Sequence, residues 1–302
     1  MRTHLIGLAA IMAAFPVWTQ ATPGMGKGIL SNAKSWVYQL QHIDLPTLGT
    51  TTADLVVIDA SQDGSVEGSF TPADIAALKT KPDGSQRVVL AYFSIGEAED
   101  YRFYWDDEWY DQAPDWLHEE NSDWAGNYPV KFWHPDWQAI LFGSPDCYLD
   151  RIIAAGFDGV YLDRVDAFEI DDPALTRPQR AAHMIALVRS LAAYARARTP
   201  SFVVVAQNGE ELLADGSYRH TVDGVGKEDL LYGLESDGKR NANGDIRVSL
   251  DYLRRLAEAG KPVFLVEYLT EPQTIAQAHA DAETLGMPIF ITDRDLDNAY
   301  SR

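Results

Sequence analysis

The sequence alternates eight times between short runs rich in Val, Ile, Tyr and Phe and longer stretches of helical character. The runs occupy residues 35–41, 55–61, 88–96, 159–166, 202–209, 221–226, 262–269 and 288–293. The helical stretches are clearest at residues 72–79, 136–155, 178–198, 249–259 and 271–285. Strands and helices that alternate in this way favour a parallel sheet closed into a barrel. An open doubly wound sheet is the main alternative, but it usually carries a glycine-rich phosphate turn after an early strand, and this sequence has none. We therefore predict an α/β fold, a single (β/α)8 TIM barrel.

The first 21 residues have the pattern of an export signal. A basic start precedes an apolar run at residues 5–15, which is too short to span a bilayer. Thr19 and Ala21 fit a small-x-small cleavage site, so we expect cleavage after Ala21 and a secreted or periplasmic protein. Residues 22–302 then form one domain, because no repeat or linker interrupts a length that is normal for an α/β barrel. No later stretch is long and apolar enough to cross a membrane. We also expect the protein to be a monomer.

Cysteine, histidine and charge narrow the classes of function. A single cysteine, Cys147, and seven dispersed histidines offer no metal-ligand spacing, so we expect no metal site. The chain has 45 acidic and 25 basic residues, which gives a formal net charge of −20. Nucleic acid is a poor partner for such a chain, whereas a cationic substrate is attracted to it. Taken alone, the charge is explained more simply by solubility.

Four of the predicted strands run through apolar residues to an acidic residue at their end. These acids are Asp59, Asp163, Glu267 and Asp293. Active sites of barrel enzymes lie at the C-terminal ends of the strands. One strand-end acid alone is better explained as a helix cap or an arginine partner, but four in equivalent positions favour a site. If they face the barrel mouth, alternation directs their apolar neighbours toward the helices; these are Val56, Ile58, Val160, Leu162, Phe264 and Val266.

The connection after the third strand is unusually long and aromatic. Residues 97–135 contain no convincing helix but hold five of the eight tryptophans. Its aromatic residues are Tyr101, Phe103, Tyr104, Trp105, Trp109, Tyr110, Trp116, Trp124, Tyr128, Phe132 and Trp133. Aromatic faces suit the C–H face of a sugar ring and attract ammonium groups. The alternative is a lid that packs against itself, and we expect about half of these rings to do so, with the others walling the cleft.

Several segments, in order along the chain, resemble the endo-α-1,4-polygalactosaminidase family, glycoside hydrolase family 114. They are YFSIGEAEDYR at residues 92–102, WAGNY at 124–128, FDGVYLDRVD at 157–166, QNG at 207–209, DGVGKE at 223–228, VEY at 266–268 and DRDL at 293–296. The resemblance implies a (β/α)8 glycoside hydrolase domain that cleaves α-1,4-linked galactosamine polymers without a cofactor. It also implies two catalytic residues, Asp163 at the end of the fourth strand and Glu228 after the sixth.

The chemistry of glycosidic cleavage agrees with that pair. One carboxylic group donates a proton to the leaving oxygen, while the other attacks the sugar or directs water. Asp163, on a stiff strand, suits the nucleophile, and Glu228, expected on a loop, suits the acid/base. A retaining mechanism predicts carboxyl groups roughly 5–5.5 Å apart, and an inverting one roughly 6.5–9.5 Å; we predict the shorter range. The chain departs from the family at Glu267, where we expect Asp, which alters a subsite. The last helix is expected to be short or missing.

The expected function is retaining, endo-acting cleavage of a cationic amino-sugar polysaccharide such as a biofilm exopolysaccharide. Two alternatives remain: a glycosidase for a neutral α-galactoside, and a non-catalytic polysaccharide-binding barrel. Some of the acids expected to bind ammonium groups have a competing structural role, as partners of Arg102, Arg164 or Arg294. The residues expected to bind substrate are Asp59, Tyr92, Glu97, Tyr101, Trp105, Trp124, Tyr128, Asp166, Asn208, Glu267, Tyr268 and Asp293.

Overall fold

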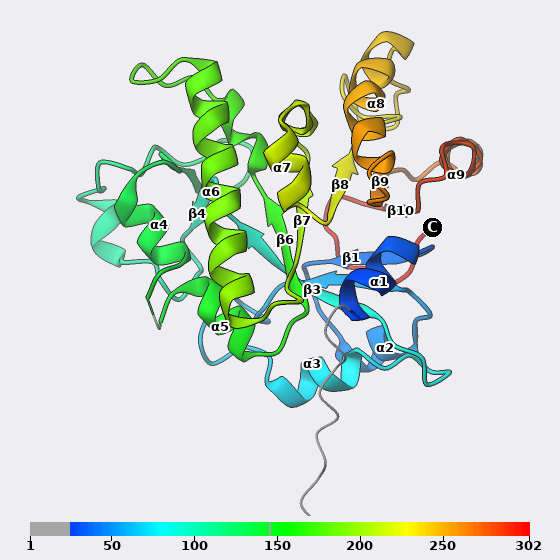
Figure 1. Cartoon of the computed structure of the whole chain (residues 1–302), viewed down its shortest axis with the longest axis horizontal. Helices are drawn as coiled ribbons and strands as arrows, with labels where there is room; N and C mark the ends of the chain where they lie inside the picture. The colour runs from blue at the N-terminus through cyan, green and yellow to red at the C-terminus, as the bar shows by residue number, and fades with distance from the viewer. Residues whose placement is uncertain (1–24, 145) are drawn as a thin grey trace, which may run out of the picture.

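Eight parallel strands form a nearly closed barrel in a computed structural model that describes residues 25–144 and 146–302 (Figure 1). The predicted signal segment lies outside these residues. In order around the sheet, the strands are β1 (Trp36–Gln39), β2 (Leu55–Ile58), β3 (Val88–Ser94), β6 (Gly159–Asp163), β7 (Val203–Gln207), β8 (Gly224–Glu228), β9 (Val263–Tyr268) and β10 (Ile289–Thr292). The amide of Leu40, after β1, donates to the carbonyl oxygen of Leu296, after β10, at 2.8 Å. The predicted (β/α)8 barrel is therefore confirmed.

The helices surround the barrel between successive strands (Figure 1). They are α1 (Met25–Asn32), α2 (Leu45–Thr50), α3 (Pro72–Leu78), α4 (Pro135–Leu141), α5 (Tyr148–Ala154), α6 (Arg177–Arg198), α7 (Gly216–Thr221), α8 (Asn243–Ala257) and α9 (Pro272–Leu285). Short 3-10 turns η1 (Asp107–Tyr110), η2 (Val165–Glu169) and η3 (Glu210–Ala214) add to them. The helix predicted over residues 136–155 is two helices, α4 and α5, because Gly143 between them has a φ of 107°, which interrupts a helix. Residues 293–302 contain no helix.

Aromatic rings fill the interior of the barrel below the strand ends. The ring of Trp36 on β1 lies 6.1 Å from that of Tyr161 on β6 and 5.6 Å from that of Phe264 on β9. Trp36 contacts side chains from β6 and from β9, and only a ring in the barrel interior can reach both strands. Phe264, which Trp36 contacts, therefore faces inward. Tyr161 also explains a glycine, because a Cβ on Gly226 of β8 would lie 1.9 Å from the Tyr161 hydroxyl oxygen.

The inward position of Phe264 fixes the orientation of β9. Alternation then directs Val266 and Tyr268 inward and Glu267 outward. The expectation that Glu267 faces the mouth and Phe264 and Val266 face the helices is therefore wrong. Every residue of β9 is buried, so both faces are covered and the hydrophobic pattern does not distinguish them.

The long aromatic connection folds as a cover beside the barrel mouth. Its ends pair as a short antiparallel ladder of β4 (Glu97–Glu99) and β5 (Asn127–Pro129). Between them, the ring of Trp109 lies 5.1 Å from those of both Trp105 and Trp116, and Trp116 continues to Trp137 of α4 at 5.3 Å. Most rings of this segment thus pack against one another and against the barrel helices.

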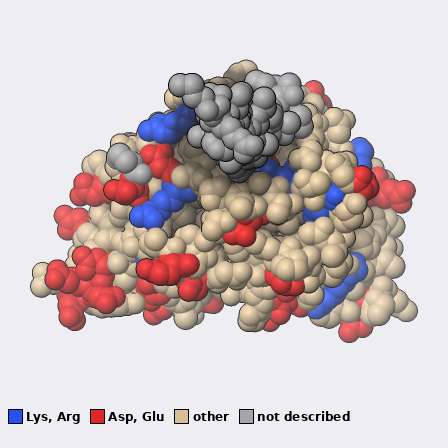
Figure 2. Space-filling model, turned by 90° about the horizontal axis from the view of Figure 1, so that it is seen from below, with Lys and Arg blue, Asp and Glu red and all other residues tan. Residues whose placement is uncertain are grey.

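Acidic side chains do not gather in one patch on the face shown in Figure 2. Figure 2 shows several separate groups of Asp and Glu on one face, with fewer Lys and Arg among them. This spread agrees with a general contribution of the charge to solubility.

Candidate active site

A cavity of about 710 Å³ opens at the C-terminal ends of the strands. Its wall contains side chains from segments far apart in the sequence, and both Asp163 and Glu228 line it. Eight of the predicted binding residues line it too: Asp59, Tyr92, Glu97, Tyr101, Trp124, Asp166, Asn208 and Tyr268. The structure therefore brings most of the predicted site residues together around one cavity.

Asp163 is the last residue of β6, and both of its carboxylate oxygens are held. The hydroxyl of Tyr92, on the neighbouring strand β3, donates to Oδ2 at 2.6 Å, and the amide of Arg164 donates to Oδ1 at 2.7 Å. Burial and the nearby charge of Glu228 raise the pKa of Asp163 to about 7, although the bond from Tyr92 opposes the shift. Near neutral pH this carboxyl group therefore exchanges a proton readily.

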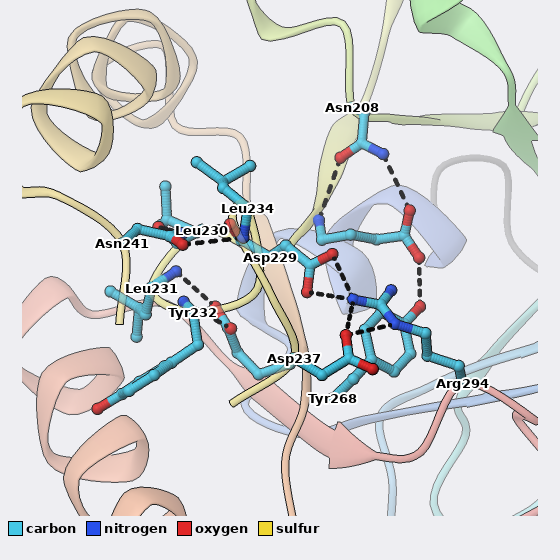
Figure 3. Close-up of polar contacts among 12 residues, drawn as sticks. Asn208, Asp229, Leu230, Leu231, Tyr232, Leu234, Asp237, Asn241, Tyr268 and Arg294 are labelled. Atoms are coloured by element: carbon cyan, nitrogen blue, oxygen red, sulfur yellow. Dashed lines mark hydrogen bonds and ion pairs between the residues drawn. The ribbon is translucent and has the colours of Figure 1, made fainter. Parts of the chain in front are cut away.

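Glu228 is the last residue of β8, so the expectation of a loop position is wrong. Its Oε2 accepts a hydrogen bond from the Asn208 amide at 2.9 Å, and its Oε1 accepts one from the Tyr268 hydroxyl (Figure 3). The backbone amide of Glu228 also donates to the Asn208 side-chain oxygen at 3.1 Å. Asn208 and Tyr268 therefore fix the orientation of this carboxylate.

Backbone strain in the described residues is concentrated around this cavity. The non-glycine residues with positive φ are His42, Arg164, Asn208, Asp229 and Leu296, with angles of 49° to 59°. Four of them line the cavity, and the fifth, Asp229, directly follows Glu228. The left-handed region is unfavourable for side chains other than glycine, and residues held there cluster at functional sites.

Arginines neutralise part of the acidic wall. Arg102 is buried and bonds to Asp59 at 2.7 Å and Glu99 at 2.5 Å, while Arg164 pairs with Glu97 at 3.1 Å. Asp59 and Glu97 thus act as ion-pair partners of arginines, which is the structural role considered for them as an alternative to substrate binding. Asp166 lines the same cavity and is attracted by Arg164, but it makes no ion pair within 4.0 Å among residues 25–144 and 146–302.

The same part of the chain shows neither a metal centre nor a membrane span. No group of three or more His, Cys, Asp or Glu side chains within it has the arrangement of a metal site. No helix described by the structure combines the length and the hydropathy that a bilayer-crossing segment needs.

A comparison of the sequence with models of known protein families identifies the class of enzyme. The family model of Glycoside-hydrolase family GH114 matches residues 18–302. The chain belongs to glycoside hydrolase family GH114. It is accordingly a glycoside hydrolase, and its carboxylate-lined cavity lies where barrel enzymes carry their active sites.

Relatives of this GH114 chain occur in distant organisms. An uncharacterized protein of Methanocaldococcus jannaschii is 40% identical over 78% of this chain and 66% of its own length. The glycoside hydrolase domain of PelA from Pseudomonas aeruginosa superposes with a TM-score of 0.65 and 21% identity over 88% of this chain and 97% of that one. Ega3 of Aspergillus fumigatus, solved in complex with galactosamine, superposes with a TM-score of 0.64 and 22% identity over 93% and 98%. These two structures share the barrel fold with the GH114 chain.

Four predicted binding residues do not line the cavity. Trp105 and Tyr128 pack together with ring centroids 4.7 Å apart, because the aromatic connection folds on itself. Glu267 points away from the barrel axis, as the orientation of β9 requires, and is fully buried. Asp293 follows β10 and pairs with Arg302.

Other cavity residues were not predicted from the sequence. The Tyr38 hydroxyl donates to the Gln207 side chain at 3.0 Å, and Arg294, Asp295 and Asp297, which follow β10, also line the cavity. Gln207 directly precedes Asn208 at the end of a predicted strand, so its position carried a usable signal. The residues after β10 carried none, because their place depends on how the chain closes the barrel.

We expect replacement of Arg102 by Leu to destabilise this GH114 barrel strongly. The change leaves Asp59 and Glu99 as buried carboxylates without their cation, and breaking a buried ion pair in this way costs about 3–5 kcal/mol. Urea unfolding measures the free energy. The control is Arg177→Leu, since Arg177 pairs with Glu169 and Glu211 on the exposed surface and its loss costs about 1 kcal/mol or less. Equal losses in the two variants would contradict the structural role of Arg102.

Proposed function

We propose that this chain is a retaining, endo-acting hydrolase of α-1,4-linked galactosamine-containing polysaccharide, with Asp163 and Glu228 as its catalytic pair. One observation carries the proposal: both carboxylates line a single cavity that also holds seven further acids but only three arginines. Those acids are Asp59, Asp63, Glu97, Glu99, Asp166, Asp295 and Asp297. A cleft of this charge favours a cationic sugar over a neutral one.

The reaction proceeds in two displacement steps. In the first, Glu228 gives its proton to the glycosidic oxygen while an oxygen of Asp163 attacks the anomeric carbon, so that the sugar–oxygen bond breaks and a glycosyl ester forms. In the second, Glu228 takes a proton from water, the water oxygen attacks the same carbon, and the ester bond to Asp163 breaks. The two inversions restore the original anomer.

A cationic substrate assists this chemistry through the protonation state of Asp163. The raised pKa of Asp163 leaves much of this carboxyl group protonated near pH 7. An ammonium group bound close to Asp163 and Asp166 stabilises their charged forms and thus lowers both pKa values. Binding therefore ionises the nucleophile. A neutral sugar provides no such effect.

Two exposed aromatic rings of the cover supply stacking surfaces for a polymer. Tyr101 and Trp124 line the cavity with exposed fractions of 46% and 52%. Tyr101 also borders a second, open hollow of about 320 Å³, where Glu67, Asp100 and Asp107 add negative charge. A chain lying across both spaces has sugar units on each side of the cleaved bond, which suits endo-acting cleavage.

Asp166→Asn should selectively weaken the binding of de-N-acetylated substrate. The change removes one unpaired negative charge from the cavity while the size of the side chain is kept. For galactosamine oligomers we expect KM to rise about 10-fold, the loss of one charge-assisted contact. For the N-acetylated oligomers, which carry no ammonium group, KM should change by less than about two-fold. Steady-state kinetics on both series decides, and equal changes would count against ammonium recognition by Asp166.

Digestion of a defined galactosamine oligomer series tests the function as a whole. Mass analysis of the products distinguishes internal from terminal cleavage, and NMR of the first-formed product gives the anomer. We expect internal cleavage with retention. An inverted product would make Asp163 the base that activates water. Cleavage of neutral α-galactosides alone would favour the first alternative, and binding without any turnover would favour the polysaccharide-binding barrel.

We also propose export of the protein, with residues 1–21 removed, and a monomeric catalytic domain from residue 22 onward. The support is the pattern of a basic start, an apolar run and a small-residue cleavage site. N-terminal sequencing of the protein recovered outside the cytoplasm, together with its mass in solution by light scattering, tests both statements.

A further inference from the structure

Glu267 is a buried carboxylate that the reaction itself does not use. Its side chain is fully inaccessible, yet each oxygen accepts one backbone N–H group, from Leu231 at 2.8 Å and from Tyr232 at 3.1 Å. Lys227 attracts this carboxylate from the neighbouring strand but is bonded to Glu210 at 3.3 Å. Burial raises the pKa of Glu267 to about 8, although the two N–H bonds oppose the shift. A carboxylate in such a place is costly unless the bonds that it makes are needed.

The two N–H groups belong to the turn that directly follows Glu228. The turn crosses the end of β9, where the Asp229 amide donates to the Val266 carbonyl oxygen at 3.2 Å. Two consecutive residues of β9 therefore contact Glu228 and the turn that follows it, one residue from each face of the strand. Tyr268 points inward and bonds to the carboxylate of Glu228, while Glu267 points outward and bonds to the backbone three and four positions later.

This turn is strained and needs external support. Asp229 has a left-handed φ of 51°, which is unfavourable for a residue with a side chain. The Asn241 amide donates to the carbonyl oxygens of Asp229 and Leu230 at 2.8 and 2.9 Å. Arg294 pairs with Asp229 at 3.1 Å and with Asp237 at 2.7 Å (Figure 3). Glu267 is the carboxylate that fixes the middle of the turn, between these two contacts.

We propose that Glu267 is a positioning residue, which holds the strained turn after Glu228 and thereby keeps the Glu228 carboxylate aligned with the cleaved bond. The inference rests on the proposed catalytic role of Glu228. It replaces the expectation that Glu267 binds substrate, and it assigns to this side chain an effect on turnover rather than on substrate affinity. A misplacement of the acid by about 1 Å is enough to slow a reaction about 100-fold.

The test is Glu267→Gln, measured with the full chain on galactosamine oligomers. Gln has the same size, but its NH₂ group faces one of the two backbone N–H donors, so one bond to the turn is lost. We expect kcat to fall about 10- to 100-fold while KM changes by less than about two-fold. Glu267→Asp keeps both acceptor oxygens on a shorter side chain, and its kcat should recover to within about five-fold of the wild type. An unchanged kcat in Glu267→Gln, or a kcat of Glu267→Asp no higher than that of Glu267→Gln, would overturn the proposal.

A matched control lies at the start of β8, the strand that ends at Glu228. Asp223 directly precedes β8, accepts the Val204 amide at 3.0 Å and pairs with Arg196 at 2.7 Å. Asp223→Asn should lower the melting temperature without lowering kcat. If it lowered kcat as much as Glu267→Gln does, the loss of turnover in Glu267→Gln would be explained by general destabilisation of the fold and not by positioning. Glu228→Gln, assayed alongside, separates the two hypotheses. If it retains full turnover, the proposed function fails; if it is inactive while Glu267→Gln is fully active, only the positioning role fails.

Discussion

Asp163→Asn should reduce kcat/KM on galactosamine oligomers by roughly 10⁴-fold or more and, at the same time, stabilise the fold. The loss of activity follows because an amide cannot form the glycosyl ester, and removal of a covalent nucleophile has effects of about this size in other hydrolases. The gain in stability follows from the raised pKa of Asp163, which burial and Glu228 move from its ordinary value of 3.8 to about 7.

The sign of the stability effect depends on pH. Between about pH 4 and pH 7 the unfolded chain has released the Asp163 proton while the folded protein still retains it. Stability conferred by this residue therefore falls as pH rises through that range and is lowest above about pH 7. One pKa unit corresponds to about 1.4 kcal/mol. The carboxylate is partly open to the cavity, so we expect Asp163→Asn to stabilise the fold by on the order of 2 kcal/mol at pH 8.

Thermal unfolding at two pH values checks this prediction. The variant should melt above the wild type at pH 8, and the difference should shrink toward zero at pH 4. The control is Asp74→Asn, since Asp74 is a helix-capping acid at the exposed start of α3 whose pKa is lowered by its bonds to Thr71. That variant should be less stable than the wild type at pH 8. An Asp163→Asn variant that is both active and less stable would contradict the assignment.

Glu228→Gln should slow the hydrolysis of natural oligomers by about 10²- to 10⁴-fold, the usual contribution of a general acid/base. The size of the loss should depend on the leaving group. A substrate with an acidic leaving group, such as a nitrophenol, needs no proton in the first step, so its bond cleavage should be nearly as fast as in the wild type. Water activation in the second step still needs the carboxylate, so a burst of nitrophenol followed by slow turnover is expected.

The leaving-group series also tests which carboxylate has which role. Asn208 and Tyr268 orient the Glu228 carboxyl group by hydrogen bonds, and burial raises the pKa of Asp163. If Asp163→Asn rather than Glu228→Gln spares the nitrophenyl substrate, the two roles are exchanged. Asn208→Ala provides an intermediate control, because it removes one of the bonds that orient Glu228 and leaves both carboxylates in place.

The barrel could be predicted because its signal is local and repeated. Each strand is a short apolar run, and the position of Asp163 at the end of the fourth run follows from the sequence alone. The orientation of a strand is less predictable when both of its faces are buried. For β9, the acid at position 267 and the tyrosine at position 268 are both compatible with the mouth, and the packing of Phe264 against Trp36 decides between them.

Ion pairs and loop packing were less accessible to prediction for a different reason. Arg102 reaches Asp59 across 43 residues, and no pattern of spacing in the sequence indicates such a pair. The aromatic connection has the composition of a sugar-binding surface, but rings such as Trp105 and Tyr128 gain more from mutual burial than from exposure. Among the aromatic rings of that segment, all within the described residues, only Tyr101 and Trp124 line the cavity.

The aromatic packing inside the barrel also determines where a long polymer can bind. Tyr38 lines the bottom of the cavity, and its ring lies 5.1 Å from that of Tyr161 and 5.9 Å from that of Trp36, so within the described residues the barrel axis is closed beneath Asp163. A long polymer cannot pass through such a barrel. It has to bind across the mouth of the barrel and dissociate from the same face. The endo-acting cleavage proposed above accordingly predicts cuts at internal bonds reached from the mouth, with a rapid early drop in polymer length and few short products.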